Sequence, residues 1–261
     1  LALVEAARQR ADHVTVSIFV NPTQFGPGED FDAYPRTLDA DLAALAEAGG
    51  VDAVFAPSAG EMYPFGLPPY ATVSIRDLDR HLCGAVRPGH FEGVTSVVTK
   101  LYLACRPHVA VFGEKDAQQL AILRRMTAEL GFGVDVVGHP IVREADGLAL
   151  SSRNRYLTPS ERKEALALSR AVRAAEEALA LGIRDGGALR DAMWAALAEA
   201  PGVRSQYAEV VDADTLQPVE TLAEDGPSQG RYLAAVAAFV GDTRLIDNTT
   251  LVVGDATGEG H

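Results

Sequence analysis

The chain has 261 residues, of which 48% are hydrophobic and 23% are charged, as in an ordinary soluble globular protein. Its 36 acidic and 23 basic side chains give a formal net charge of −13 without any Lys/Arg run, which argues against nucleic-acid and anionic-membrane binding. The two cysteines, Cys83 and Cys105, have no metal-ligand spacing and are too few for a disulfide framework, so we expect reduced thiols in a cytoplasmic protein. No apolar run approaches the ~20 residues of a membrane span.

The first half of the chain alternates short apolar segments with longer helical ones. Residues 1–10 have the pattern of an amphipathic helix without a capping residue before it, so we expect that sequence upstream of Leu1 is missing; the alternative is a frayed terminal helix that needs no cap. This alternation predicts an α/β fold, with a parallel sheet and helices on both of its faces. We predict strands at 14–20, 51–56, 108–112 and 134–137, helices at 38–48, 93–105 and 116–130, and irregular structure over 57–92.

The pattern changes near residue 143. Thr158-Pro159-Ser160-Glu161 combines an N-cap, a proline at the first helical position and a glutamate three residues on, which predicts a helix to about Leu181. A further helix is predicted at 187–199, followed by strands at 207–212, 231–240 and 243–247. We therefore expect two domains, 1–142 and 143–261, of which the second is a smaller α+β domain.

Polar side chains follow the first predicted strand, at the edge where open α/β sheets bind their ligands. Asn21 and Gln24 carry amides that suit the carboxylate or hydroxyl groups of a small substrate. The alternative is that Asn21 only closes an Asx turn.

A second polar loop, Phe112-Gly113-Glu114-Lys115-Asp116, ends one predicted strand and opens a helix. The free N–H groups of a helix N-terminus favour phosphate, and Lys115 is one of only three lysines beside 20 arginines. The alternative is that Asp116 is only an N-cap and Lys115 a solvated neighbour.

A third polar loop lies near the predicted domain boundary. Ser151, Ser152, Arg153 and Arg155 could clamp an anion, or could form only a polar hinge. His90 lies in another polar loop and is a further candidate. No G-x-G-x-x-G follows a strand, and no histidine pair has zinc spacing.

Five segments, taken in order, resemble the pantoate–β-alanine ligase (pantothenate synthetase) family of the nucleotidyltransferase superfamily. They are Phe19-Val-Asn-Pro-Thr-Gln-Phe-Gly26, Asp32-Ala-Tyr-Pro-Arg-Thr37, Arg87-Pro-Gly-His-Phe-Glu-Gly-Val94, Phe112-Gly-Glu-Lys-Asp-Ala-Gln-Gln119 and Val142-Arg-Glu-Ala-Asp-Gly-Leu-Ala-Leu-Ser-Ser-Arg-Asn154. The resemblance implies a Rossmann-like first domain, a C-terminal lid and a cytoplasmic homodimer. It also implies ATP-dependent condensation of pantoate with β-alanine through a pantoyl adenylate, with Mg²⁺ present and with AMP and pyrophosphate released.

The resemblance also implies the roles of individual residues. Gln24 and Gln119 would hold pantoate, and Gln24, Asn21 and Tyr34 would hold β-alanine. Asp41 would be a magnesium ligand, although acids in a first helical turn also suit the helix dipole. ATP would be bound by Gly113, Glu114, Lys115, Asp116, Val142, Leu150, Ser151, Ser152 and Arg153, of which Lys115, Ser151, Ser152 and Arg153 would act in catalysis.

One feature of the family does not occur in these 261 residues. Its His-x-Gly-His motif, which supplies two phosphate ligands and the proton donor, should lie immediately before a Leu-Ala-Leu-Val helix. We therefore expect a truncated chain with impaired adenylation, because positioned charge supplies much of such a barrier. The alternatives are a nucleotide-binding module without catalysis and a related adenylate-forming enzyme that acts on another acid.

Overall fold

A computed structural model describes residues 1–254, which form two compact units. The first unit contains Leu1–Arg80 and Gly84–Pro140, and the second contains His81–Cys83 and the chain from Ile141 onward. The predicted boundary between residues 142 and 143 lies close to the step from Pro140 to Ile141. The roles expected for the two domains stay predictions.

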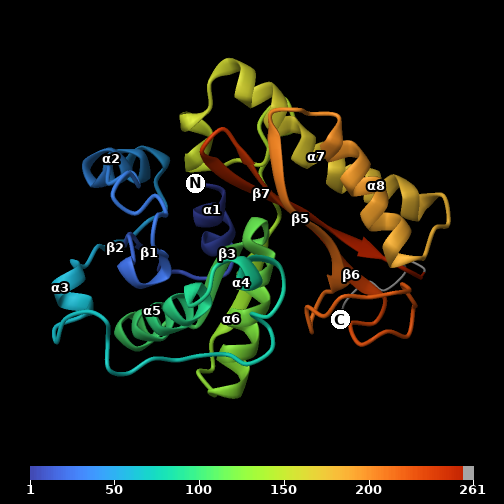
Figure 1. The fold of residues 1–261 in the computed structure, drawn as a ribbon. Helices are drawn as coiled ribbons and strands as arrows, with labels where there is room; N and C mark the ends of the chain where they lie inside the picture. Colours follow the sequence, from blue (N-terminus) through green and yellow to red (C-terminus); the bar gives the residue numbers. More distant parts are fainter. Residues whose placement is uncertain (255–261) are drawn as a thin grey trace. The chain divides into compact units, whose positions relative to one another are not determined.

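Short strands and helices alternate along the first unit (Figure 1). The α4 helix starts in the short segment that belongs to the second unit. In chain order the elements are α1 (Ala2–Arg8), β1 (Thr15–Ser17), the 3₁₀ turn η1 (Pro22–Gln24), α2 (Leu38–Ala48), β2 (Ala53–Phe55), α3 (Ala59–Met62), α4 (Leu82–Val86), α5 (His90–Cys105), β3 (Val109–Gly113), η2 (Glu114–Asp116), α6 (Ala117–Glu129) and β4 (Asp135–His139).

The strands of the first unit pair in parallel, as predicted. β1 pairs with β2 and β3 pairs with β4, so residues 1–140 hold two two-stranded sheets and not the single sheet expected. The first strand is shorter than the predicted 14–20 because its ladder ends where β2 ends, with Ile18 N donating to Phe55 O (2.9 Å). The chain then turns at Pro22, which has no N–H to donate.

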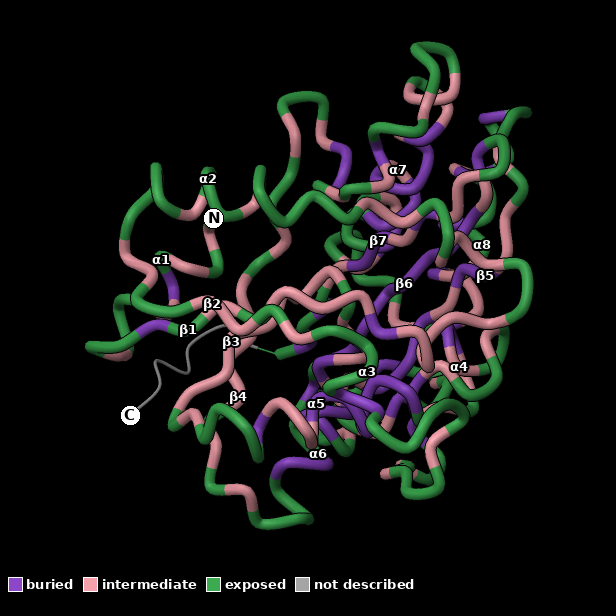
Figure 2. The backbone as a smooth tube through the Cα atoms, turned by 90° about the vertical axis from the view of Figure 1, so that its left-hand side faces the viewer, coloured by how far each residue is buried: buried purple, intermediate pink, exposed green. Residues whose placement is uncertain are grey.

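The prediction of irregular structure over 57–92 is wrong in three places, because α3, α4 and the start of α5 all lie within this range. α3 begins with a capping box, in which Ser58 Oγ accepts from Glu61 N and Glu61 Oε2 accepts from Ser58 N. α5 begins at His90, three residues earlier than expected, after Gly89 in the left-handed region (φ 79°). None of the residues of α2 is buried, as its colours in Figure 2 show, and the apolar core of this unit lies instead where α5 packs on α6.

The second unit is an antiparallel sheet covered by two helices, which confirms the α+β expectation. α7 lies against β6 and β7, and α8 lies against β5 (Figure 1). The capping box predicted at Thr158 is present: Thr158 N donates to Glu161 Oε2 (2.8 Å). The elements are η3 (Ser152–Tyr156), α7 (Pro159–Ala180), α8 (Gly186–Ala198), β5 (Val203–Asp212), β6 (Arg231–Val240) and β7 (Thr243–Val252).

Two strands of this sheet are longer than predicted. β5 starts at Val203 and continues through a register shift between Ser205 and Tyr207, and β7 continues to Val252. Both extensions pair with β6, which is ten residues long. The hydrogen-bonded ladder therefore continues along β6 beyond the point where the apolar patterns of β5 and β7 end. The core of the unit includes small residues of α7 and β6 such as Ala171 and Ala238, both fully buried, together with larger ones such as Leu168. Within residues 1–254, no helix combines the length and the apolarity needed to cross a bilayer.

Candidate functional site

The loop after β1 is built around the buried amide of Asn21, which is 2% exposed. Its Oδ1 accepts hydrogen bonds from Thr23 N (3.3 Å), Thr23 Oγ1 (3.0 Å) and the hydroxyl of Tyr63 (2.7 Å). The bond from Thr23 N is the Asx turn that the sequence left as the alternative interpretation. Tyr63 follows α3 and was not singled out in the sequence, because nothing local shows that it lies beside this loop.

The other end of the Asn21 amide connects this loop to α5. Its Nδ2 donates to Gln24 Oε1 (3.1 Å) and to the carbonyl of Gly93 (3.2 Å). A Cβ atom built on Gly93 would lie 2.6 Å from Thr23 C and 2.8 Å from Gln24 N. The loop is therefore seated directly on the backbone of α5, at a point where only glycine fits.

Gln24 lines a cavity of about 520 Å³ in the first unit. The walls come from the loop 22–27, from a proline-rich segment that includes Pro68 and Pro69, and from the start of α5. Tyr34 lies near the loop through the ring of Phe25, with the ring centroids 5.7 Å apart. A half-exposed residue with an amide side chain, lining a cavity of this size, suits a small polar ligand.

A network of Glu29, Arg87 and His90, the first residue of α5, supports the same loop. Glu29 accepts two hydrogen bonds from Arg87, at Nε (2.7 Å) and Nη2 (2.6 Å), and Arg87 Nη1 lies 3.0 Å from His90 Nε2. His90 Nδ1 is 2.7 Å from the carbonyl of Gln24. His90 was a candidate in the sequence. The roles of Arg87 and Glu29 were missed because they depend on contacts 58 residues apart.

The same contacts shift two pKa values. Burial of His90, followed by the charge of Arg87, lowers its pKa from 6.5 to about 4, although Gln24, Glu29 and Asp116 act in the opposite direction. Burial alone would raise the pKa of Glu29, but the hydrogen bond and charge of Arg87 outweigh it and the pKa is lowered. The imidazole is therefore neutral and the carboxylate ionised near neutral pH.

The predicted phosphate loop lies where β3 ends and α6 begins. Gly113 has an ordinary φ of −77°, and a Cβ built there would meet no described atom within 4 Å. No protein contact thus requires a glycine at this position, and the space above it is open. Lys115 is half-buried in η2, and Asp116 stands at the N-cap position of α6 although its side chain makes no capping bond within residues 1–254.

The two glutamines that open α6 are used differently. Gln118 is buried, with its Nε2 donating to Leu78 O (2.8 Å) and its Oε1 accepting from Gly84 N (3.4 Å). Gln119, which the resemblance pairs with pantoate, is partly exposed. Of the two, Gln119 therefore has the exposure that a ligand contact needs.

In the second unit, the polar loop at residues 142–155 begins with a turn whose two sides are hydrogen-bonded to each other. Arg143 forms a bridge with Ala149, and Leu150 N donates to Val142 O (2.8 Å), so Val142 and Leu150, two of the residues expected to bind ATP, are neighbours. Leu150 and Val142 are 54% and 40% exposed, which is unusual for apolar residues within an ordered turn. Arg143 also makes two hydrogen bonds to the carboxylate of Asp247 (2.7 and 3.0 Å), which is 1% exposed.

The expected serine–arginine phosphate segment begins η3. Ser151 Oγ accepts from Arg153 N (3.3 Å), while Ser152 is exposed and Arg153 is half-exposed. The buried Asn154 donates to Glu144 Oε1 (2.6 Å) and to Ala149 O (3.1 Å). The serines and arginine are thus presented by a turn that is anchored from behind by Asn154.

The expected metal ligand Asp41 lies in the first turn of α2. Its Oδ1 accepts from Thr37 Oγ1 (3.2 Å). Over the described part of the chain, no group of three His, Cys, Asp or Glu residues is placed to hold a metal ion. Asp41 thus offers one carboxylate, which by itself does not make a protein metal site.

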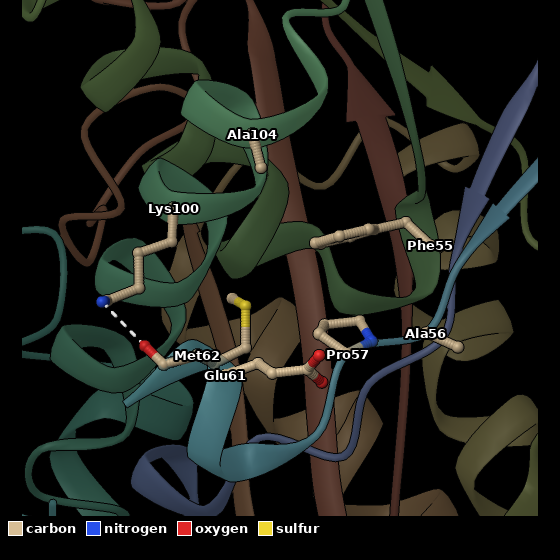
Figure 3. A pocket seen from close by; sticks show the side chains of 7 residues that line it. All are labelled: Phe55, Ala56, Pro57, Glu61, Met62, Lys100 and Ala104. Atoms are coloured by element: carbon tan, nitrogen blue, oxygen red, sulfur yellow. Dashed lines mark hydrogen bonds between the residues drawn. The ribbon is translucent and has the colours of Figure 1, made fainter. Parts of the chain in front are cut away.

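A second cavity of about 380 Å³ lies beside β2, α3 and α5 (Figure 3). Figure 3 shows Lys100 reaching from α5 to Met62, whose carbonyl accepts its hydrogen bond (2.9 Å). The same ammonium group lies 5.2 Å from the ring centroid of Tyr63. None of the predicted site residues lines this cavity, and Lys100 serves there to hold the chain after α3 against α5.

A known protein family matches almost the whole chain. The family model described as pantoate-beta-alanine ligase matches residues 1–250. The pantothenate synthetase of Salinibacter ruber is 59% identical over 97% of this chain and 86% of its own length, and that of Moorella thermoacetica is 51% identical over 98% and 87%.

Solved structures give the same answer. The pantothenate synthetase of Thermus thermophilus matches with a TM-score of 0.87 and 47% identity, over 95% of this chain and 87% of that one. The pantoate-beta-alanine ligase of Francisella tularensis, solved with beta-gamma ATP and beta-alanine, matches with a TM-score of 0.73 and 30% identity, over 95% and 83%. The resemblance seen in the sequence is thereby confirmed: the chain belongs to the pantoate–β-alanine ligase family of enzymes.

Proposed function

We propose that the chain condenses pantoate with β-alanine by way of a pantoyl adenylate, with ATP as the activating substrate. The observation that carries the proposal is the open space over Gly113, beside Lys115 and the start of α6, where backbone N–H groups favour a polyphosphate. The Francisella relative, solved with an ATP compound and β-alanine, supports the choice of ligands.

The reaction has two steps. A pantoate carboxylate oxygen attacks the α-phosphorus of ATP, the bond to the β-phosphate bridging oxygen breaks, and pyrophosphate leaves. The amine of β-alanine then attacks the acyl carbon, the acyl–phosphate bond breaks, AMP leaves, and the amine gives up a proton. Such steps need chiefly positioning and neutralisation of charge. Lys115 and Arg153 would supply the charge, with Ser151 and Ser152 as hydrogen-bond donors to phosphate.

Apart from Asn21, whose amide already has partners in the protein, the remaining site residues follow the resemblance. Gln24 and Gln119 would bind pantoate, and Gln24 and Tyr34 would bind β-alanine. Glu114, Asp116, Val142 and Leu150 would complete the ATP site. Asp41 stays a proposed contact of Mg²⁺, but because its donor set is a single carboxylate we derive no step through the metal. A cytoplasmic homodimer, with 1–142 as nucleotide domain and 143–261 as lid, is part of the same proposal.

Pantoate-dependent exchange of labelled pyrophosphate into ATP, without β-alanine, tests the adenylate directly. The protein should show exchange, and ¹⁸O in the pantoate carboxylate should appear in AMP once β-alanine is added. Lys115→Ala should reduce exchange at least tenfold, whereas Lys163→Ala, an exposed position on α7, should not. ATP binding without exchange would instead support a nucleotide-binding module, and exchange with another acid would support a related adenylating enzyme.

A further inference from the structure

The partners of the Asn21 amide leave it a single orientation. The carbonyl of Gly93 can only accept a hydrogen bond, and the N–H of Thr23 can only donate one. Nδ2 must therefore face Gly93, and Oδ1 must face Thr23. The second hydrogen of Nδ2 points at Gln24, so the Gln24 atom 3.1 Å away must be the acceptor Oε1.

The orientation of Gln24 follows from that of Asn21. With Oε1 turned toward Asn21, the Nε2 group lies at the opposite corner of the amide. Among the described residues, no acceptor is placed to receive its hydrogens. Gln24 lines the 520 Å³ cavity, so its two N–H donors are available to a ligand there.

The backbone carbonyl of Gln24 is held by hydrogen bonds that run through His90 and Arg87, and these also allow only one arrangement of protons. This carbonyl can only accept, so the proton of His90 must be on Nδ1. The guanidinium of Arg87 can only donate, so Nε2 of His90 must carry a lone pair. Glu29 holds Arg87 in place with two hydrogen bonds. The imidazole is thus a neutral Nδ1–H tautomer, a state that burial also favours.

We propose that Asn21 and His90 are positioning residues that hold Gln24 with its Nε2 donors toward the cavity. This position would then recognise a hydrogen-bond acceptor of the substrate, a carboxylate or hydroxyl oxygen, and would not receive an ammonium group. The inference rests on the proposed function, in which Gln24 binds pantoate and β-alanine. It assigns Asn21 a different use from direct contact with β-alanine, because both of its N–H donors and its oxygen already have partners in the protein.

Steady-state kinetics of the enzyme test the role of the Asn21 side chain. Asn21→Asp replaces a donor by an acceptor, so Gln24 should turn its Nε2 toward residue 21 and present Oε1 to the cavity. The KM for an acid substrate should rise about ten- to hundredfold, with a much smaller change in kcat. An unchanged KM in a variant that unfolds at the wild-type temperature would overturn this role.

The hydrogen bond from His90 to the Gln24 carbonyl can be tested by a substitution that keeps the donor. Asn has an N–H near the place of Nδ1, so His90→Asn should retain most of the affinity that His90→Ala loses. His108→Ala, at an exposed position that does not line the cavity, is the control and should leave KM unchanged. Equal loss in His90→Asn and His90→Ala would overturn the role of the Nδ1 donor.

A spectroscopic readout does not depend on activity. In ¹⁵N-histidine NMR near pH 7, His90 should show a neutral ring protonated on Nδ1, whereas an Nε2–H or doubly protonated ring would overturn the inference. Gln24→Ala distinguishes the proposed substrate role of Gln24 from the positioning role of Asn21 and His90. If it leaves KM unchanged, the proposed substrate role of Gln24 fails. If it raises KM while Asn21→Asp and His90→Ala do not, only the positioning role fails.

Discussion

Replacing Gly93 by alanine tests whether the substrate loop depends on its seat against α5. Gly93 is buried within a 16-residue helix, where alanine would ordinarily be preferred. The new Cβ, however, would lie 2.6 Å from Thr23 C and 2.8 Å from Gln24 N. Both atoms belong to the backbone, so neither can turn aside as the end of a flexible side chain would. The loop itself has to move.

The size of the effect follows from two opposing contributions. Alanine in a helix interior gains roughly 1 kcal/mol over glycine, whereas overpacking costs about 1–3 kcal/mol. We expect a net loss of about 1 kcal/mol in the free energy of unfolding. Ordinary contact begins at 3.4 Å, so the loop must retreat by at least about 0.8 Å from the 2.6 Å approach of Thr23 C to the new Cβ, and somewhat further for the carbonyl oxygen of Thr23, which lies closer still. A displacement near 1 Å at a substrate-binding group can reduce turnover on the order of a hundredfold.

Urea unfolding and steady-state kinetics measure the two effects on one sample. Gly60→Ala is the matched control, because Gly60 lies in α3 with no described atom within 4 Å of a built Cβ, and it should leave kcat/KM unchanged. The reasoning is refuted if Gly93→Ala stabilises the protein as a simple helix substitution would and leaves kcat/KM at the wild-type value.

Three further predictions concern the other parts of the site. Gly113→Ala should weaken ATP binding about tenfold in calorimetry, at an unchanged unfolding temperature, because only a ligand would meet the new Cβ. Asp247→Asn should cost about 2 kcal/mol in urea unfolding, since it removes the charge of a buried carboxylate that is paired with the partly exposed Arg143, whereas Asp214→Asn in an exposed pair should cost under about 1 kcal/mol. The fold lowers the pKa of His90 from 6.5 to about 4, so the unfolded chain takes up a proton first as the pH falls. Stability present above pH 6.5 should therefore decrease by up to about 3 kcal/mol toward pH 4, and His90→Asn, which does not titrate, should flatten this slope.

The elements with local signals could be predicted from the sequence. The Thr158 capping box determines where α7 begins, and glycine determines where α2 ends, at Gly49 with φ 69°. α3 also has such a signal, Ser58 followed by Glu61, which was hidden among the prolines and aromatics around it. Strand lengths were predicted less well, because a strand ends where its partner ends, and the partner of β1 lies 38 residues along the chain.

In the candidate site, too, some residues could be predicted from the sequence and others could not. Gln24, Lys115 and the serines could be named because their residue types suit the chemistry and follow strands or open turns. The groups that hold them could not, since Tyr63 reaches Asn21 across 42 residues and Asp247 reaches Arg143 across 104. Sequence spacing contains no information about contacts at that range without the fold.

A single sequence motif contains both residues that hold the loop in place and residues that are exposed to a ligand. In the segment from Val142 to Asn154, the side-chain amide of Asn154 donates both of its hydrogens, to Glu144 and to Ala149. Ser152, two residues earlier, is exposed. Asn21 and Gln24 show the same division over three residues. A motif of this family therefore specifies a small hydrogen-bonded structure together with the groups it presents. Substituting a supporting amide should alter binding as strongly as substituting the group that touches the ligand, because the latter has no fixed orientation without it.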